Sequence, residues 1–220
     1  FPKGTKVITP IAGFPTTLNP IYQVGFEPVF VDIQLDNLNL DVKQVEKVAK
    51  ESGAKIITFA HVLGNPPNMD QLMELVDKYN LVLLEDCCDA LGSTYKGEPL
   101  GKFGEMASCS FYPAHHITTG EGGMITTNDE KLAYKLRCLR DHGAEMSDLQ
   151  RHLGPKPYLL SSYEYAGYNF RMTDLQAAIA YSQAIKAKEN LLKMKKNVTL
   201  YKKYLDKESI IFQKIDKNVK

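Results

Sequence analysis

The residues most suited to chemistry lie together at positions 108–123, which read SCSFYPAHHITTGEGG. This run holds the Ser110 hydroxyl, the imidazoles of His115 and His116, the Glu121 carboxylate and three glycines. Small residues let the backbone approach a ligand closely, and hydroxyls together with backbone N–H groups suit a phosphate. A metal held by the two histidines and Glu121 is a weaker interpretation, because the side chains of adjacent histidines diverge on a strand or loop. No metal site is therefore expected.

The segments that must position these residues alternate between strands and helices. Strands are expected at residues 7–10, 29–32, 56–60, 81–84, 108–112 and 124–127. Helices are expected near residues 16–24, from 41 to 53, after the N-cap Asn68, and from 129 to 140. This alternation is typical of parallel βαβ units, whose crossover helices cover both faces of the sheet. The sequence thus predicts an α/β fold with a mostly parallel sheet.

Ligands of parallel α/β sheets bind beyond the carboxyl ends of the strands. The chemically capable residues at those ends are residues 9–14, Asp32, His61, Glu85, Asp86 and residues 110–116. Taken singly, most have an ordinary structural interpretation. His61 fits a hydrogen-bonded core histidine, Phe14 a packed aromatic and Asp86 a helix cap. Only the run at 108–123 is hard to explain in that way.

The C-terminal third of the chain reads differently. Residues 141–165 are polar and weakly periodic, and we interpret them as a long loop of the kind that is usually functional or poorly ordered. The sequence TDLQ at 173–176 is a capping box, which opens a long helix. One stripe of this helix carries Leu175, Ala178, Ile179, Ser182 and Ile185. Its Lys-rich continuation toward Asp206 is expected to be helical and solvated.

Charge and hydropathy exclude several classes of partner. The 220 residues carry 27 Lys and Arg against 26 Asp and Glu, spread along the chain, so we expect neither nucleic-acid nor membrane binding. No apolar run approaches the roughly 18 residues of a membrane helix, and the N-terminus lacks the build of a signal peptide. A cytoplasmic protein is expected. Because the chain starts at Phe1 with no disposable leading residues, we also expect a fragment of a longer protein.

Four ordered motifs, EDCCDALG at 85–92, SFYP at 110–113, GEGG at 120–123 and GYNFRMTD at 167–174, resemble the sugar aminotransferase family called DegT/DnrJ/EryC1/StrS. The resemblance implies the PLP-dependent fold type I, with a three-layer α/β/α large domain. Residues 1–172 would form that cofactor-binding domain without its N-terminal part. Residues 173–220 would form a connecting helix and the start of a C-terminal small domain.

His115 stands where this family normally has a lysine, five residues after the phosphate-binding serine. The lysine holds PLP as a Schiff base, which an imidazole cannot form. The branch with histidine is the 3-dehydrases of nucleotide-linked 4-keto-6-deoxy sugars, and YPAHH at 112–116 resembles it. In that branch, pyridoxamine phosphate (PMP) condenses with the C4 ketone of the sugar. The histidine then removes a proton from the C4′ carbon of the cofactor while the C3 hydroxyl leaves, and imidazoles suit such a transfer at neutral pH.

The resemblance also implies roles for other residues. Asp86 matches the carboxylate against the ring nitrogen, where it keeps the ring protonated and strengthens it as an electron sink. Phe14 matches the aromatic that stacks on the ring, and Ser110 matches the phosphate ligand. Asp89 stands where many aminotransferases have glutamine near the ring hydroxyl. Asn169 matches a residue that reaches the cofactor phosphate of the partner subunit, which implies a homodimer with shared active sites.

Cysteine positions separate two subgroups of this branch. One couples dehydration to reduction through an iron–sulfur cluster, held by cysteines in the loop after Arg-x-His-Gly. The sequence RDHG is present at 140–143, but residues 141–165 contain no cysteine. Because a cluster needs about four thiolate ligands, no iron–sulfur cluster is expected. The residues of the motifs nevertheless resemble the iron–sulfur subgroup more closely than the other.

The function implied by the resemblance is C3 deoxygenation of a nucleotide-linked keto-sugar, in deoxysugar or lipopolysaccharide biosynthesis, with His115 as the base. One alternative is an ordinary PLP-dependent sugar-nucleotide aminotransferase, although no lysine lies between Lys102 and Lys131. Another is a non-catalytic family member, because an inactive enzyme would also have lost the lysine. Retention of Asp86 and Ser110 argues against such decay.

Overall fold

A six-stranded sheet forms the centre of the protein. The computed structural model describes residues 1–144, 163–205 and 210–220. The strand order is β2-β1-β3-β4-β7-β8. The strands are β1 (Lys6–Pro10), β2 (Glu27–Val31), β3 (Ile56–Ala60), β4 (Val82–Asp86), β7 (Met106–Ser110) and β8 (Gly123–Thr126). Every neighbouring pair is parallel except β7 and β8, which are antiparallel. The predicted mostly parallel α/β sheet is confirmed.

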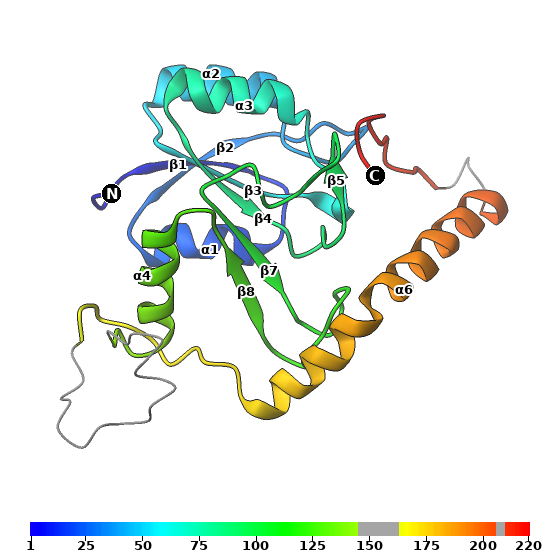
Figure 1. Ribbon diagram of the computed structural model, residues 1–220. Helices are drawn as coiled ribbons and strands as arrows, with labels where there is room; N and C mark the ends of the chain where they lie inside the picture. The colour runs from blue at the N-terminus through cyan, green and yellow to red at the C-terminus, as the bar shows by residue number, and fades with distance from the viewer. Residues whose placement is uncertain (145–162, 206–209) are drawn as a thin grey trace.

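Helices cover both faces of this sheet (Figure 1). The described helices are α1 (Pro15–Gln23), α2 (Val42–Ser52), α3 (Met69–Tyr79), α4 (Glu130–Arg140) and α6 (Asp174–Tyr204), with the 3-10 turn η1 at Val62–Gly64. Helix α6 extends away from the sheet. Helices α2 and α3 lie side by side on one face, whereas α1 lies on the other. This arrangement confirms the three layers.

Local sequence signals explain where the helices begin and end. The side chain of Asn68 accepts a hydrogen bond from the Gln71 N–H at 3.1 Å, as the predicted N-cap of α3 should. Thr173 and Gln176 form the predicted capping box of α6. Helix α2 ends at Gly53, whose φ of 68° lies in the left-handed region that glycine adopts without strain.

Alternation along the strands builds two unequal cores. Ile57 and Phe59 point toward α2 and α3 and join the main core, and both are 0% exposed. Ile56 points the other way, toward α1, and joins a small cluster with Val7 and Ile21. The face under α1 is therefore covered by much less apolar material than the face under α2 and α3.

Two local predictions need correction. The strand expected at 108–112 is β7, which begins at Met106 and ends at Ser110. It ends there because the Tyr112 N–H turns back to Ser110 Oγ at 3.1 Å, and Pro113 has no N–H to continue a ladder. The sequence predicts no strand between residues 85 and 107, whereas the structure has a short hairpin of β5 (Thr94–Tyr95) and β6 (Glu98–Pro99) there. Most of the loop expected at 141–165 lies outside the described residues.

The end of the chain returns to the body after α6. The Lys214 N–H donates to Asp36 O at 2.7 Å, and Lys220 and Thr94 exchange backbone hydrogen bonds of 2.9 and 3.0 Å. Val219 packs against the main core, where it forms a bridge with the buried Tyr95. Residues 218–220 thus add a strip to β5 of the hairpin.

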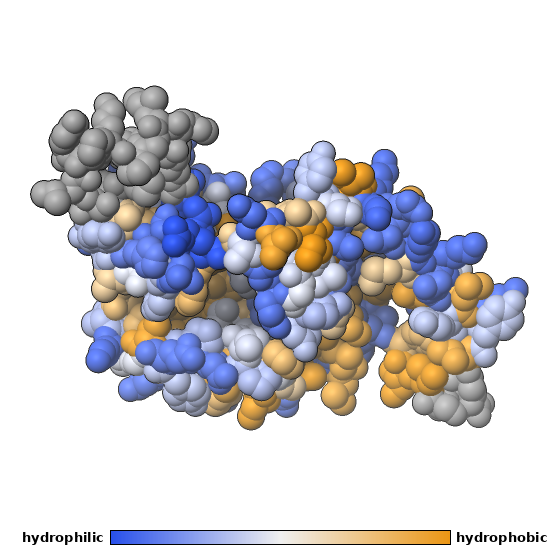
Figure 2. Space-filling view, turned by 90° about the horizontal axis from the view of Figure 1, so that it is seen from below, coloured by the Kyte–Doolittle hydropathy of each residue, from blue (hydrophilic) through white to orange (hydrophobic). Residues whose placement is uncertain are grey.

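Helix α6 carries its predicted apolar stripe, but none of its residues is buried within the described chain. Leu175 is 80% exposed and Ile185 is 67% exposed. Hydrophobic side chains also reach the surface on the side that Figure 2 views from below. No helix among the described residues is long and apolar enough to cross a membrane.

Candidate active site

The carboxyl ends of the parallel strands bring the predicted residues to one edge of the sheet. Asp86 ends β4 and pairs with Ser108 of β7, so that Ser110 lies two residues further along the neighbouring strand. Glu85 and Asp86 are consecutive, and their side chains therefore point to opposite faces. Asp86 lies on the side of α1, and Glu85 lies on the side of the main core.

Two donors hold the Asp86 carboxylate in place. Its Oδ2 accepts the Thr17 hydroxyl at 2.9 Å, and its Oδ1 accepts the Cys88 N–H at 3.1 Å. Sequence reasoning did not single out Thr17. The available signal was a hydroxyl one helical turn after the N-cap Phe14, in a helix that starts beside the site. The carboxylate is thus fixed in orientation by α1 and by its own turn.

The loop after β7 is closed by backbone hydrogen bonds. The Phe111 N–H donates to Gly122 O at 2.9 Å, and the Thr119 N–H donates to Phe111 O at 3.0 Å. Ser110, at the start of this loop, is half-buried. The chemically rich run at 108–123 is therefore one tight connection between β7 and β8, and it carries a hydroxyl and both imidazoles.

His115 and Asp89 meet across this edge. His115 Nδ1 lies 3.3 Å from Asp89 Oδ1, and the two side chains are 20% and 45% exposed. A carboxylate beside Nδ1 favours the tautomer that carries its proton there, which leaves Nε2 free to accept a proton. The sequence placed Asp89 near a cofactor ring, whereas the structure brings it next to the predicted base.

His116 adds an imidazole to this pair. Its Nδ1 is buried and has no hydrogen-bond partner among the described residues. Burial lowers the pKa of His116, the nearby Asp89 opposes that shift, and His115 adds to it. His116 is therefore kept neutral more strongly than a solvent-exposed histidine.

The remaining two predicted residues lie at the margins. Phe14 caps α1 and is 72% exposed, at the carboxyl end of β1. Asn169 is also exposed and lies beside the end of α4, where it bridges to Asp141. The structure does not bring Asn169 next to Ser110 within this chain.

The segment that carries Asn169 is held by two glycines packed back to back. A Cβ on Gly143 would lie 1.7 Å from Tyr165 O, and one on Gly167 would lie 2.0 Å from Gly143 N. Gly143 also has a φ of 84°. Neither position has room for a side chain, so the sequences RDHG and GYNF meet through bare backbone.

Three buried side chains near the site could in principle hold a metal ion, namely His61, Glu85 and Cys87. Their chemistry argues against it. Both Glu85 oxygens already accept hydrogen bonds, and burial raises the pKa of the Cys87 thiol far above its usual range, aided by Glu85 and Asp86. A metal would need the thiolate. The cluster is therefore a hydrogen-bonded pair of His61 and Glu85 with a neighbouring thiol.

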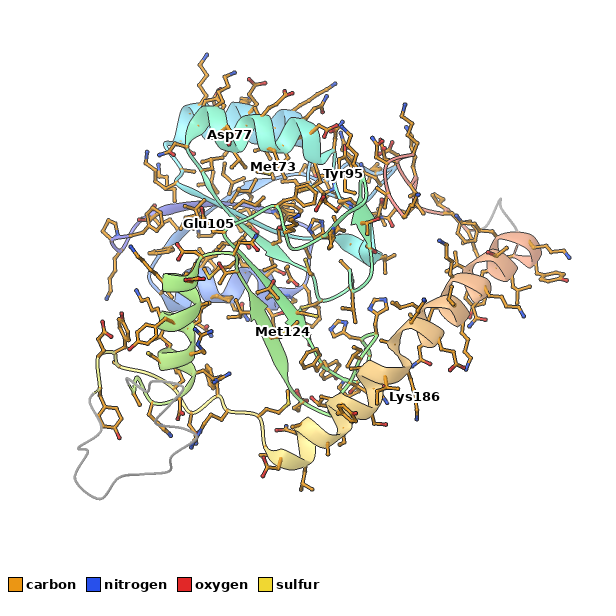
Figure 3. The ribbon with its side chains drawn as sticks, viewed as in Figure 1. Met73, Asp77, Tyr95, Glu105, Met124 and Lys186 are labelled. Carbon is orange, nitrogen blue, oxygen red and sulfur yellow. The ribbon has the colours of Figure 1, made fainter. Side chains whose placement is uncertain are left out.

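Two hollows flank the sheet. A cavity of about 400 Å³ lies between α1 and the sheet, with Thr17, Asp86 and Ser108 in its wall. A second hollow, of about 790 Å³, lies at the opposite edge, where Met73 and Asp77 of α3 face Glu105 (Figure 3). The second hollow adjoins the amino ends of β4 and β7, away from the predicted residues. Only the first touches the candidate site.

The fold and the site define an α/β domain with its acidic, hydroxyl and imidazole groups at the carboxyl edge of a mostly parallel sheet. The sequence profile of the DegT/DnrJ/EryC1/StrS aminotransferase family matches residues 2–219. The chain belongs to this family, as the four motifs predicted.

Relatives of known name show how close the likeness is. The lipopolysaccharide biosynthesis protein RfbH of Salmonella typhimurium is 40% identical over 216 residues, which cover 92% of this chain and 49% of that protein. The dTDP-4-dehydro-2,6-dideoxy-D-glucose 3-dehydratase of Saccharopolyspora spinosa is 42% identical over 197 residues, which cover 83% and 42%. The chain thus spans about half the length of the relatives that it matches.

Solved structures give the same result. A putative sugar aminotransferase from Streptococcus pneumoniae, in its PMP form, aligns with a TM-score of 0.81 at 28% identity. The alignment covers 90% of this chain and 54% of the other. The fold is therefore that of the PLP-dependent sugar aminotransferases and dehydratases.

Proposed function

We propose that this chain is the cofactor-binding part of a PLP- or PMP-dependent enzyme that acts on a nucleotide-linked keto-sugar. The reaction we propose is removal of the C3 hydroxyl from a 4-keto-6-deoxy sugar, in deoxysugar or lipopolysaccharide biosynthesis. The observation that carries the proposal is His115, which stands in place of the family's lysine and has Asp89 at 3.3 Å from Nδ1. The names of the relatives, which include both a 3-dehydratase and a sugar aminotransferase, support the substrate class.

The residues present fit the cofactor. Asp86 offers a carboxylate, already oriented by Thr17 and Cys88, to a protonated ring nitrogen. The Ser110 hydroxyl lies at the start of the tight loop after β7, where it can contribute to a phosphate site. The unpartnered Nδ1 of His116 leaves a buried polar atom available close to the proposed base. When bound, the cofactor would supply the electron sink for loss of the C3 hydroxyl.

His115 would act as the proton carrier. Asp89 would hold one proton on Nδ1 of His115. Nε2 would then be free to take up the proton removed from the C4′ carbon of the cofactor and to return it later. Asp89 would also stabilise the imidazolium formed in between, because a neighbouring carboxylate favours the charged ring. His115 itself cannot anchor the cofactor covalently, so binding would depend on Asp86, Ser110 and aromatic stacking by Phe14.

Several further features belong to the proposal. We propose that Asn169 serves the cofactor of a second subunit, which makes the enzyme a homodimer with shared sites, and its placement away from Ser110 is compatible with that role. Residues 1–172 would be the large domain and residues 173–220 the connecting part. A cytoplasmic location is supported by four free thiols, and no iron–sulfur cluster is proposed.

The decisive experiment uses the full-length protein. PMP and a GDP- or dTDP-linked 4-keto-6-deoxyhexose are supplied with and without glutamate, and the product is analysed by mass spectrometry and NMR. We expect a product that has lost the C3 hydroxyl, and no lysine that borohydride can trap with PLP. An amino sugar with an intact C3 hydroxyl would favour the aminotransferase. Absence of PMP binding would favour a non-catalytic family member.

A further inference from the structure

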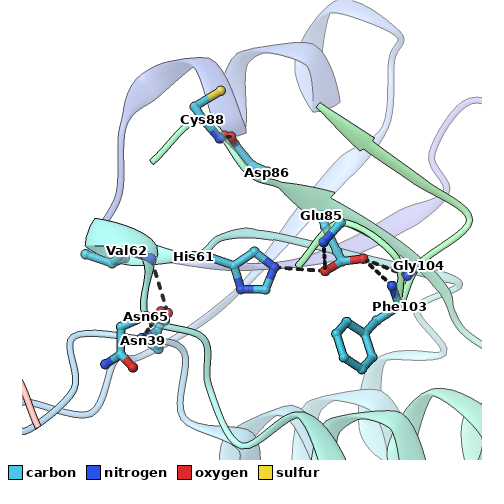
Figure 4. A network of polar contacts seen from close by, with 10 residues as sticks. Asn39, His61, Val62, Asn65, Glu85, Asp86, Cys88, Phe103 and Gly104 are labelled. Atoms are coloured by element: carbon cyan, nitrogen blue, oxygen red, sulfur yellow. Dashed lines mark hydrogen bonds and ion pairs between the residues drawn. The ribbon is translucent and has the colours of Figure 1, made fainter. Parts of the chain in front are cut away.

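One buried carboxylate next to the site is surrounded by four donors (Figure 4). Glu85 is 2% exposed on β4. Its Oε1 accepts the N–H groups of Phe103 at 2.8 Å and Gly104 at 2.7 Å. Its Oε2 accepts the Gly101 N–H at 2.9 Å and lies 2.9 Å from His61 Nε2. Every donor comes from a segment outside β4.

The first of these segments leads into β7, the strand that carries Ser110. Residues 101–104 come just before β7, which carries Ser110 at its far end. They also lie directly against β4, because a Cβ on Gly104 would be 2.5 Å from Leu83 O. Glu85 therefore attaches the start of β7 to β4 from the side of the main core.

The second segment leads to Asp89. His61 follows β3, and its own N–H donates to Asp86 O at 3.0 Å. The η1 turn begins at the next residue, and a Cβ on Gly64 would lie 3.0 Å from Asp89 O. The backbone that holds His61 thus contacts both the Asp86 and the Asp89 backbone.

We propose that Glu85 is a positioning residue that sets the relative placement of Asp86, Asp89 and Ser110, and through them the affinity for the PLP or PMP cofactor. The inference rests on the proposed cofactor site. Glu85 faces the main core whereas Asp86 faces α1, so Glu85 acts through the backbone and not by touching the ligand. A shift of about 1 Å in such a frame is enough to cost a large part of a site's efficiency.

The proton arrangement of the network predicts which substitutions preserve it. His61 Nδ1 is buried and has no hydrogen-bond partner among the described residues, whereas Nε2 lies 2.9 Å from Glu85 Oε2. Because a carboxylate can only accept, Nε2 carries a proton and donates it to Glu85. Glutamine at position 61 can place an amide N–H where Nε2–H lies, whereas leucine cannot. Glutamine at position 85 replaces one carboxylate oxygen with an amide NH₂ group, which would face the donors of the network and could not accept from them.

The test measures PMP affinity of the full-length protein by calorimetry, well below the melting temperature of each variant. Glu85→Gln is expected to weaken PMP binding by at least about tenfold. Leu72→Ala is the matched control, because Leu72 is 0% exposed in the same core but belongs to α3, away from the site. It should lower the melting temperature while PMP affinity stays within about twofold of wild type.

The His61 variants separate positioning from general stability. His61→Leu should match Glu85→Gln, and His61→Gln should recover most of the affinity. Equal PMP affinity in Glu85→Gln and wild type would overturn the inference, as would equal losses in Glu85→Gln and Leu72→Ala. If Glu85→Gln does not fold, the two His61 variants decide in the same way. A wild-type protein that binds PMP but makes an amino sugar would refute the proposed dehydration and leave this inference intact.

Discussion

The hydrogen bonds of the Glu85 carboxylate allow a quantitative prediction of their contribution to stability. Replacement of Glu85 by glutamine keeps the size of the side chain and removes its charge. The four donors around Glu85 are the N–H groups of Phe103, Gly104 and Gly101 and the Nε2 of His61. The single amide oxygen of glutamine can accept from at most two of them. A buried donor left without an acceptor costs about 1–3 kcal/mol, so the two donors that glutamine cannot satisfy should lower the free energy of unfolding by about 2–6 kcal/mol at pH 7. That is a large part of the about 5–15 kcal/mol available to a typical domain.

The acid dependence gives the prediction a sign. Burial alone would raise the pKa of Glu85, but hydrogen bonds from His61 and the backbone outweigh burial, and the pKa lies below its ordinary value. A lowered folded pKa means that the stabilisation is complete above the unfolded pKa of about 4.3 and is lost as pH falls through the lower folded pKa. The difference in stability between wild type and Glu85→Gln should therefore be constant from pH 7 to about 5 and shrink below about 4.3.

Urea unfolding, followed by far-UV circular dichroism between pH 3 and 7, measures this difference. Glu46→Gln is the control, because Glu46 also accepts a hydrogen bond from a basic side chain, Lys78 at 2.8 Å, but on the surface. Exposed pairs contribute little, so this variant should barely move the midpoint. A Glu85→Gln protein as stable as Glu46→Gln, or a gap that does not shrink in acid, would refute the reasoning.

Three further predictions follow from the site. Asp89→Asn should lower kcat of the full-length enzyme by about 10- to 100-fold, since it removes the carboxylate from His115; an unchanged kcat would contradict this role. The lowered pKa of His116 means that the folded state favours the neutral ring. The contribution of His116 to the free energy of unfolding is therefore complete above pH about 6.5 and is lost as pH falls through the lower pKa of the folded state. His116→Gln should flatten the pH dependence of the free energy of unfolding below pH about 6.5, as measured by urea titrations. Gly143→Ala should destabilise the protein more than Gly97→Ala. Both glycines have a positive φ, but a Cβ at position 97 would meet open space, so Gly97→Ala should cost about 1 kcal/mol. Equal melting temperatures of the two variants would refute the clash at Gly143.

The sequence predicted what is encoded locally. The N-cap Asn68 and the capping box at 173–176 are confirmed because each depends on residues within one helical turn. The mostly parallel sheet is confirmed because buried strands alternate with helices of regular period. The family assignment is confirmed because motifs at 85–92, 110–113, 120–123 and 167–174 occur in order.

The contacts that shape the site could not be predicted, because they join distant residues. Thr17 and Asp86 are 69 positions apart, and no local pattern announces their hydrogen bond. Asp89 and His115 meet only after β4 and β7 are paired in register. The pairing of residues 218–220 with β5 is of the same kind, because it depends on the path that the chain takes after α6.

That return of the chain has a consequence for the order of synthesis. Tyr95 is 2% exposed, and Val219 lies against it in a segment made 124 residues later (219 − 95). A ribosome adds residues one at a time, so α2, α3 and the strands emerge long before the strip that covers them. The main core therefore stays open at β5 until α6 has been made and its tail has come back. A nascent chain arrested before residue 214 should show this as proteolytic cleavage near the hairpin that disappears once residue 220 has emerged.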